Sequence, residues 1–119
     1  VGFAAADNTF ENGWKWTFLV TVPTSETSFA MKFADFISGA NTIPAASNIR
    51  YYTAQSSVAS TTASAITIAG ANTYPANITL DSDKESGIAG RQIEVTMEMK
   101  VPVGSAGGSY SAQYGVKSI

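Results

Sequence analysis

The sequence predicts an all-β fold in which two antiparallel sheets, with seven or eight short strands in all, pack face to face. Thirty of the 119 residues are Val, Ile or Thr, whereas leucine occurs only twice. Side chains that branch at Cβ disfavour helices and suit a pleated sheet. Two long segments alternate strictly between apolar and polar residues, and no segment keeps a 3.6-residue apolar period over three turns. These patterns favour strands with one face on a core and the other in water.

Three strands are predicted in the N-terminal part of the chain. Residues 1–5 alternate weakly and predict a short strand. After the turn signal Asn12-Gly13 comes the clearest strand, residues 14–22, which Pro23 ends because proline cannot donate to a ladder. Its core-facing residues are Trp14, Trp16, Phe18, Val20 and Val22. Residues 29–36 alternate again, which favours a strand over one or two helical turns.

The middle of the chain contains one predicted loop and three predicted strands. Residues 38–48 include Gly39, Asn41 and Pro44, a composition typical of a loop. The strands that follow are expected at residues 49–55, 65–69 and 77–80, with a stretch rich in Ser, Thr and Ala before the second.

A long strand and a Gly-rich turn dominate the C-terminal part. Residues 81–90 are the most polar segment and predict a surface loop. Residues 91–101 alternate over their whole length, which predicts a long half-buried strand with its odd-numbered side chains inward. Residues 102–108 turn the chain, and residues 109–116 predict the last strand, with Tyr110, Ala112, Tyr114 and Val116 aligned on one face.

The composition excludes much of the chemistry that enzymes use. The chain has no cysteine and no histidine, so it lacks a thiolate nucleophile, the commonest general base and the commonest metal ligand. A net charge of -2 argues against a nucleic-acid partner. We therefore expect a single domain over residues 1–119 that is not an enzyme and needs no cofactor.

The surface composition points to a location outside the cell. Charged residues make up only 13% of the chain, whereas Ser and Thr number 27, so hydroxyl groups must supply much of the polar surface. Residue 1 is Val rather than Met, which suggests either a mature chain whose export signal has been removed or a domain of a longer protein. No run of about 18 apolar residues is present, so no membrane span is expected. We expect an extracellular protein at the cell surface.

The C-terminal motif resembles the last hairpin of bacterial extracellular immunoglobulin-like domains. The matching residues are Val101, Pro102, Gly104, Gly108 and Tyr110. The combination of Asn12-Gly13-Trp14-x-Trp16 with Met31-Lys32-Phe33 also resembles β-sandwich domains of large exported surface and filament proteins. The resemblance implies an immunoglobulin-like sandwich, although the two cysteines of antibody domains are missing. Such sandwiches serve as spacers, adhesin modules, surface-layer units and filament subunits.

One acidic segment is a candidate metal site. Asp81, Asp83 and Glu85 place three carboxylates at alternate positions, and oxygen ligands at this spacing can surround a hard cation such as Ca²⁺. Lys84 lies within the cluster, and the glycine and the distal glutamate of an EF-hand are not at their places. The alternative is a solvated turn.

Two tyrosines form a candidate platform for a sugar ring. Tyr51 and Tyr52 are adjacent, so they point to opposite faces of a strand and at most one of them faces outward. Trp14 and Trp16 could also stack on a sugar, but their periodicity places them over the core.

The leading functional expectation is a structural module of a bacterial cell-surface fibre or layer that contacts copies of itself or neighbouring domains. Sandwich edges expose unpaired N–H and C=O groups, which a strand from the next subunit can satisfy. Residues 1–10 are the candidate donor, with Val1, Phe3 and Ala5 on one side; the alternative is an ordinary first strand of its own sheet. The competing function is a carbohydrate-binding or adhesin module of a larger surface protein, and an inert spacer is a third possibility.

Overall fold

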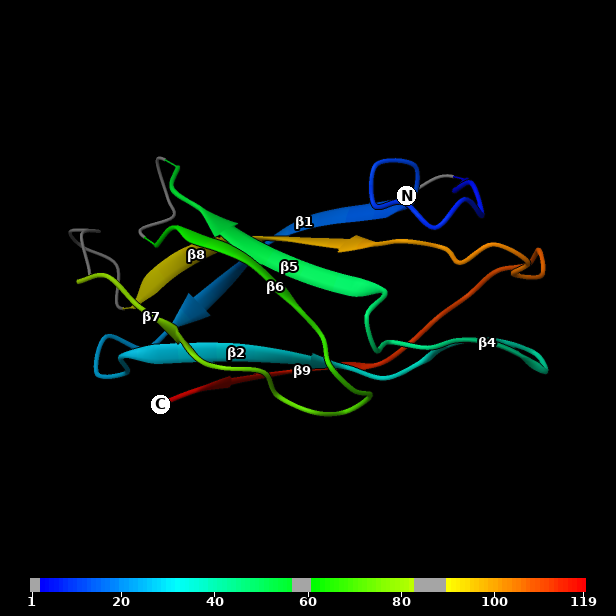
Figure 1. Cartoon of the computed structure of the whole chain (residues 1–119). Coiled ribbons are helices and arrows are strands. Elements are labelled where there is room, and N and C mark those ends of the chain that lie inside the picture. The colour runs from blue at the N-terminus through cyan, green and yellow to red at the C-terminus, as the bar shows by residue number, and fades with distance from the viewer. Residues whose placement is uncertain (1–2, 57–60, 83–89) are drawn as a thin grey trace.

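The described part of the chain is built from β-strands alone. The computed structural model describes residues 3–56, 61–82 and 90–119 (Figure 1). No helix in this part is long and apolar enough to cross a membrane. The strands, in chain order, are β1 (Trp14–Val22), β2 (Ser28–Phe33), β3 (Phe36–Ser38), β4 (Asn41–Ile43), β5 (Ile49–Ala54), β6 (Ala63–Thr67), β7 (Ile78–Thr79), β8 (Arg91–Met99) and β9 (Tyr114–Ser118).

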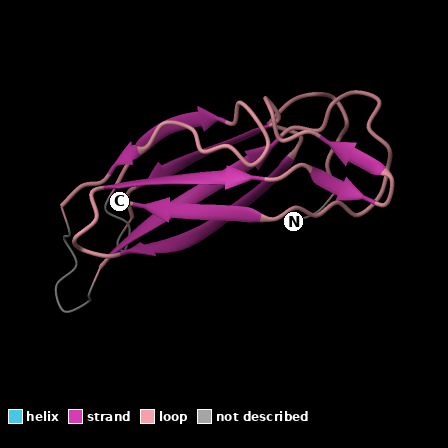
Figure 2. Cartoon of the chain, turned by 90° about the horizontal axis from the view of Figure 1, so that it is seen from below, coloured by secondary structure: helices cyan, strands magenta, loops and turns pink. Residues whose placement is uncertain are grey.

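Most strands belong to two antiparallel sheets. The larger sheet has the order β1-β8-β5-β6, and the smaller has the order β7-β2-β9. Strands β3 and β4 form a separate two-stranded hairpin. Figures 1 and 2 show the two larger sheets as separate layers, with the β3–β4 hairpin at one end of the molecule. The first strand β1 and the last strand β9 are therefore edge strands of different sheets.

The hydrophobic core lies between the two sheets. Tyr51 on β5 is fully buried, and its ring lies 6.3 Å from that of Phe29 and 6.2 Å from that of Phe33, both on β2. The Tyr51 hydroxyl accepts a hydrogen bond of 3.2 Å from the backbone N–H of Met31. These contacts cross from one layer to the other, so the structure confirms an all-β fold with facing antiparallel sheets.

The long strands agree well with the sequence, because each alternates over many residues. Strand β1 has the predicted bounds, and β8 ends two residues before the predicted end. Residues 28–33 form a strand, as expected, rather than a helical turn. The inward side chains of β8, from Ile93 to Met99, are buried. In each of these strands the apolar side chains of one face pack into the core, so the alternation of apolar and polar residues determines which face is buried.

The predicted loop over residues 38–48 is wrong for its first part and right for residues 44–48, which form no strand. Strands β3 and β4 pair there, with Ser38 opposite Asn41 across the two-residue turn Gly39-Ala40. Gly39 has a φ of +60°, and a glycine with positive φ at the first turn position is what a tight hairpin needs. The glycine that suggested a loop therefore closes a hairpin, which also brings the described strands to nine rather than seven or eight.

Two other strands are displaced from their predicted places. Strand β6 begins and ends two residues before the predicted 65–69. The last strand begins at Tyr114 rather than at residue 109, because Ser111 exchanges two backbone hydrogen bonds with Ile37 and Gln113 accepts one from Ala34. Residues 111–113 thus pair with the segment that leads into and through β3, and only the residues after them align with β2.

The N-terminal segment does not form the short strand that was predicted. No strand occurs between residues 3 and 13, and the Phe3 side chain is completely exposed. The Ala5 N–H donates to the Asn12 carbonyl over 2.9 Å, and the Asn8 N–H donates to the Val101 carbonyl over 2.8 Å. The described residues of this segment therefore form a loop at the start of β1, and an ordinary first strand in the protein's own sheet is wrong for them.

Candidate functional site

One side of the molecule is left open between β1 and β9. Strand β1 hydrogen-bonds to β8 alone, and β9 pairs with β2 alone among the described strands. The facing edges of these two strands belong to different sheets and do not pair with each other. We call this region the open side; it is formed by the inward side chains of β1 and β9 with two neighbouring rings, namely Trp14, Trp16, Phe18, Val20, Phe36, Tyr110, Tyr114 and Val116.

The strand registers show that these side chains point inward. Trp16, Phe18 and Val20 lie opposite Met97, Val95 and Ile93 of β8, all of which belong to the core. Tyr114 and Val116 lie opposite Phe33 and Met31 of β2, which are also buried. Directly opposed residues of an antiparallel pair share one face of the sheet. The open side is therefore an edge of the core at which the inward side chains are incompletely buried.

The core-facing side chains on this side are more exposed than those on the opposite side. Tyr114 is 65% exposed and Val116 is 40% exposed, although both face the core. On the opposite side, next to β6 and β7, Ile68, Ile78 and Leu80 are at most 8% exposed. The sandwich is thus sealed on one side and apolar but incompletely covered on the other.

Aromatic rings line the open side almost continuously. The Trp14 ring lies 6.1 Å from Tyr110 and 6.4 Å from Trp16, measured between centroids. The Trp16 ring stacks on Phe36 at 6.1 Å, and the Phe18 ring lies 6.1 Å from Tyr114. The contact between Phe18 and Tyr114 bridges the two edge strands, so the two sheets touch here through side chains without sharing backbone hydrogen bonds.

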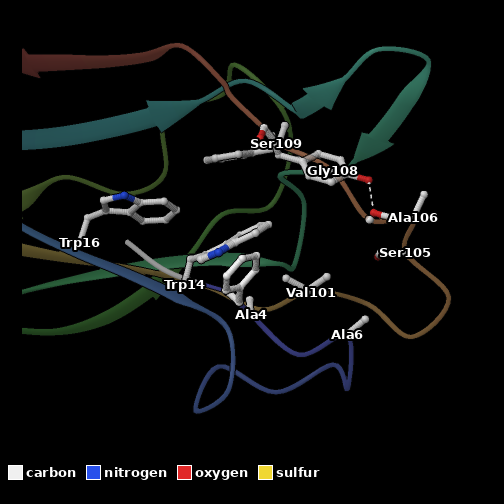
Figure 3. A pocket seen from close by; sticks show the side chains of 13 residues that line it. Ala4, Ala6, Trp14, Trp16, Val101, Ser105, Ala106, Gly108 and Ser109 are labelled. Atoms are coloured by element: carbon white, nitrogen blue, oxygen red, sulfur yellow. Dashed lines mark hydrogen bonds between the residues drawn. The ribbon is translucent and has the colours of Figure 1, made fainter.

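Two hollows follow this row of rings. The larger, of about 760 Å³, lies at the start of β1 beside the 102–109 turn, and Figure 3 shows Trp14 and Trp16 on its wall. The smaller, of about 380 Å³, is lined by Phe18, Phe33 and Tyr114. Both hollows are lined by Trp16, Phe36 and Tyr110, so they adjoin each other, and we call the two together the groove.

The lining of this groove is mostly apolar and aromatic. Its polar groups are the hydroxyls of serine and tyrosine, the indole N–H groups of Trp14 and Trp16 and backbone atoms, and no charged side chain lines either hollow in the described part of the chain. The Tyr110 hydroxyl is engaged, since it donates to the Ala106 carbonyl over 2.7 Å (Figure 3). An uncharged, aromatic groove between two free strand edges suits an extended apolar peptide, whose backbone can pair with the edges and whose side chains can enter the groove.

The structure separates the two tyrosines of the expected sugar platform. Tyr51 lies in the core with no exposed surface, and Tyr52 is half-buried on the other face of β5. Burial raises the pKa of the Tyr51 phenol above its usual value of 10.0, and the hydrogen bond from Met31 opposes that shift. A platform that contains Tyr51 is therefore wrong, because the strand's alternation directs this ring into the core.

The candidate calcium ligands are placed only in part. Asp81 is exposed; its backbone N–H donates to the Thr61 hydroxyl, and its carbonyl accepts from the Arg91 guanidinium. Asp83 and Glu85 lie outside the described residues. No cluster of three acidic side chains occurs within residues 3–56, 61–82 and 90–119. Calcium binding at this segment stays a prediction.

Of the candidate assembly residues, Phe3 lies at the mouth of the groove. Phe3 borders the larger hollow with its ring in solvent, and Ala5 is exposed while its N–H is bonded to Asn12. Val1 lies outside the described residues. Phe3 and Ala5 are thus accessible, as a donor segment requires.

Sequence reasoning missed the groove itself. The period-2 pattern assigned Trp14 and Trp16 to the core, and it aligned Tyr110, Tyr114 and other C-terminal residues on one face. The predicted inward direction of both Trp side chains is confirmed, since both pack against the core cluster, although both are only half-buried. Only the pairing of strands decides which inward-facing residues lie at an uncovered edge, and no local pattern encodes it.

No protein-family model matches the chain, and no curated protein or solved structure shows significant similarity to it. The function proposed below follows from the geometry of the open side and from the composition of the chain.

Proposed function

We propose that this protein is a non-enzymatic, exported structural subunit or module of a bacterial cell-surface fibre or layer, which joins its neighbours through the edges of its sandwich. The observation that carries the proposal is the open side, where two unpaired strand edges flank an exposed row of apolar side chains. A neighbouring subunit that inserts an extended segment there completes both sheets and the core margin together.

The backbone of β1 supports assembly at this place. The strand runs over nine residues, from Trp14 to Val22, at the edge of its sheet, without a proline and with Lys15 as its only charged side chain. Monomeric proteins usually protect such an edge with short strands, prolines, bulges or inward-pointing charges. Along β1, Lys15 is an edge charge of the kind that also protects strands, but residues 16–22 carry no such device and the pairing with β8 is regular throughout. An unprotected long edge is a template for pairing with another chain.

The apolar side chains of the groove provide the driving force. Burying a side chain as large as Val or Phe contributes about 1.5–3 kcal/mol relative to leaving it in water. Tyr114 is largely exposed, Val116 is 40% exposed, and Trp16 and Phe18 are half-buried. An inserted strand would cover all four, and the gain must exceed the entropy lost on association.

The composition supports a structural role outside the cell. The chain has neither histidine nor cysteine, which removes the side chains that most often perform catalysis and leaves no thiol sensitive to an oxidising environment. Its hydroxyl-rich, weakly charged surface suits an extracellular protein. Facing antiparallel sheets are also the architecture of immunoglobulin-like modules. The strand order differs, because β1 pairs with β8 here, whereas the first two strands of a constant-type immunoglobulin domain are neighbours.

A pair of charge substitutions tests the open side. Tyr114→Lys places a cation in the groove, and the high exposure of Tyr114 makes the change compatible with folding. Leu19→Lys is the matched control, because Leu19 is also exposed on an edge strand but points to the outer face of β1. We expect wild type and Leu19→Lys to form oligomers at high concentration in sedimentation velocity, and Tyr114→Lys to remain monomeric.

The reverse pattern would contradict the proposal. Loss of oligomers in Leu19→Lys alone would place the interface on the outer face of the larger sheet. A wild-type chain that stays monomeric at millimolar concentration would remove self-assembly altogether. Circular dichroism of each variant establishes that the β-fold is retained.

A carbohydrate-binding module is the second candidate, and one observation favours it. The half-buried rings of Trp14, Trp16 and Tyr110 line an open hollow of about 760 Å³, and aromatic faces can stack on sugar rings. The hollow lacks carboxylate and amide side chains that would bind sugar hydroxyls, which is why this function ranks second. Saturable binding on a glycan array that Trp16→Ala abolishes, in a monomeric wild-type chain, would reverse the ranking.

A further inference from the structure

We propose that the occupant of the open side is the N-terminal segment, residues 1–6, of a second copy of this chain, with Phe3 as its anchor in the smaller hollow beside Phe18 and Tyr114. The inference rests on the proposed function and adds the identity of the donor, the residue that inserts and the reason why exchange occurs between copies.

The chemistry of the segment matches the groove. Residues 1–6 read VGFAAA, with no proline and no charged side chain, and its larger side chains occur at alternate positions. A strand inserted between β1 and β9 needs this period, because every second side chain enters the core. The groove is likewise uncharged and aromatic. Phe3 is the only ring in the segment, and it is completely exposed in the single chain.

A compact loop ties the base of the segment to the end of the sandwich. The Ala5 N–H donates to the Asn12 carbonyl, and the Asn8 N–H donates to the Val101 carbonyl. Within the loop, the Asp7 carboxylate accepts three hydrogen bonds: from the Thr9 N–H at 3.1 Å, from the Thr9 hydroxyl at 2.7 Å and from the Asn12 amide at 2.7 Å. Residues 5–12 thus form a unit with its own internal bonds.

A ring at the outer face of the larger sheet fixes this loop further. Phe10 lies under the Arg50 guanidinium, whose Cζ is 4.1 Å from the ring centroid, and the Lys100 ammonium is 5.5 Å away. Arg50 is itself held by Glu98 at 2.8 Å. Cations over an aromatic face attract it. The loop is therefore anchored on the side of the sheet that faces away from the core, and Phe3, Ala4 and Ala6 line the larger hollow of their own chain but not the smaller one.

The hydrogen bond from Ala5 to Asn12 limits how far the segment can reach along its own groove. If residues 1–4 continued the Ala5–Asn12 pairing as an antiparallel hairpin, Phe3 would lie opposite Trp14 and Val1 opposite Trp16. Phe18, Tyr114 and Val116 would then remain uncovered. A second copy has no such constraint, so its Phe3 can reach the smaller hollow, which Phe18, Phe33 and Tyr114 line. The geometry therefore favours exchange between copies over insertion within one chain.

A complementation experiment tests the donor and the acceptor separately. Phe3→Asp removes the anchor but leaves the groove intact, and Tyr114→Lys blocks the groove but leaves the donor intact. Each variant alone is expected to be monomeric in sedimentation velocity, with self-association weakened about tenfold or more, as expected for loss of a buried aromatic anchor. An equimolar mixture is expected to form one-to-one heterodimers that do not grow, which native mass spectrometry identifies by mass.

Two controls support the interpretation. Phe3→Leu keeps an apolar side chain and is expected to assemble as wild type does. Val103→Asp introduces the same charge at another exposed apolar residue, in the 102–108 turn, and is also expected to assemble. Loss of assembly in Val103→Asp would show that charge alone at exposed apolar positions disrupts the oligomer, and it would overturn Phe3 as the specific anchor.

The outcomes distinguish this inference from the function on which it rests. If Phe3→Asp assembles like wild type while Tyr114→Lys does not, the open side is the interface but the N-terminal segment is not its occupant. If the mixture of the two variants yields no heterodimer, donation between copies is wrong. If wild type itself never assembles, both proposals fail.

Discussion

At the scale of single residues, the environment of Tyr51 reverses what its side chain suggested. An aromatic ring with a hydroxyl was a candidate for an exposed sugar platform, whereas the fold buries it and uses the hydroxyl inside the core. The hydroxyl accepts the N–H of Met31, so it satisfies a buried backbone donor of the facing sheet. Tyr51 therefore links the two layers by packing and by a polar contact together.

Removing that hydroxyl is expected to destabilise the protein. Tyr51→Phe keeps the ring but leaves the buried Met31 N–H without its partner, which costs about 1–3 kcal/mol. Tyr52→Phe is the control, because Tyr52 is half-buried on the other face, and it should change stability by less than about 0.5 kcal/mol. Denaturant unfolding followed by tryptophan fluorescence measures both. Equal stabilities for the two variants would contradict the role of the hydroxyl.

The same residue predicts a dependence of stability on alkaline pH. Burial raises the Tyr51 pKa above 10.0, so the folded state prefers the neutral phenol more strongly than the unfolded state does. Its contribution to stability is complete below pH 10 and is lost as the pH rises through the pKa of the folded protein. Tyr51→Phe should remove this component of the alkaline loss of stability, and Tyr52→Phe should retain it.

At the scale of elements, the start of β1 depends on a close backbone contact. Gly13 precedes the strand, and a Cβ built on it would lie 1.8 Å from the carbonyl oxygen of Met99. Met99 is paired with Trp14, the first residue of β1. The absence of a side chain at Gly13 thus lets the N-terminal loop cross the end of β8 and enter the sheet in register.

A methyl group at this position should disturb the strand it precedes. Gly13→Ala is expected to shift the Trp14–Met99 pair and to cost about 1–3 kcal/mol, in the range of overpacked sites. Gly107→Ala is the matched control, since a Cβ there meets no atom within 4 Å and should cost less than about 0.5 kcal/mol. Unfolding by denaturant gives the free energies, and amide exchange shows whether the loss begins at β1.

The short strands show why the sequence pattern did not predict every strand and its bounds. Gly39 and Asn41 are turn-forming residues, and the sequence could not distinguish an irregular loop from a hairpin that such residues also close. The residues before β9 have the alternation of a strand, but Ser111 pairs with Ile37 and the strand along β2 begins later. A strand of two to five residues carries too little alternation to set its bounds, so the partner that it meets in space sets them.

At the scale of the whole molecule, the two sides of the sandwich differ. Next to β6 and β7, Ile68, Ile78 and Leu80 are at most 8% exposed and close the core. The side along β1 and β9 has no comparable closure in the described part of the chain. This asymmetry gives the molecule one face that is suited to accept a further strand.

The sequence by itself determined the class of the fold, the long strands and the direction of nearly every large side chain along them. It could do so because alternation over nine residues, as in β1 and β8, leaves only one face that can be buried. It also determined the classes of chemistry that are missing, since those depend on composition alone.

Only the tertiary structure decided which strands become neighbours, and therefore where the core remains open. Phe18 and Val95 follow the same inward pattern in sequence, but Val95 lies on a central strand and is fully buried, while Phe18 lies on an edge strand and stays half-buried. Burial at a sheet edge depends on the order of strands, which arises from contacts between residues far apart in the chain. No local pattern carries that information.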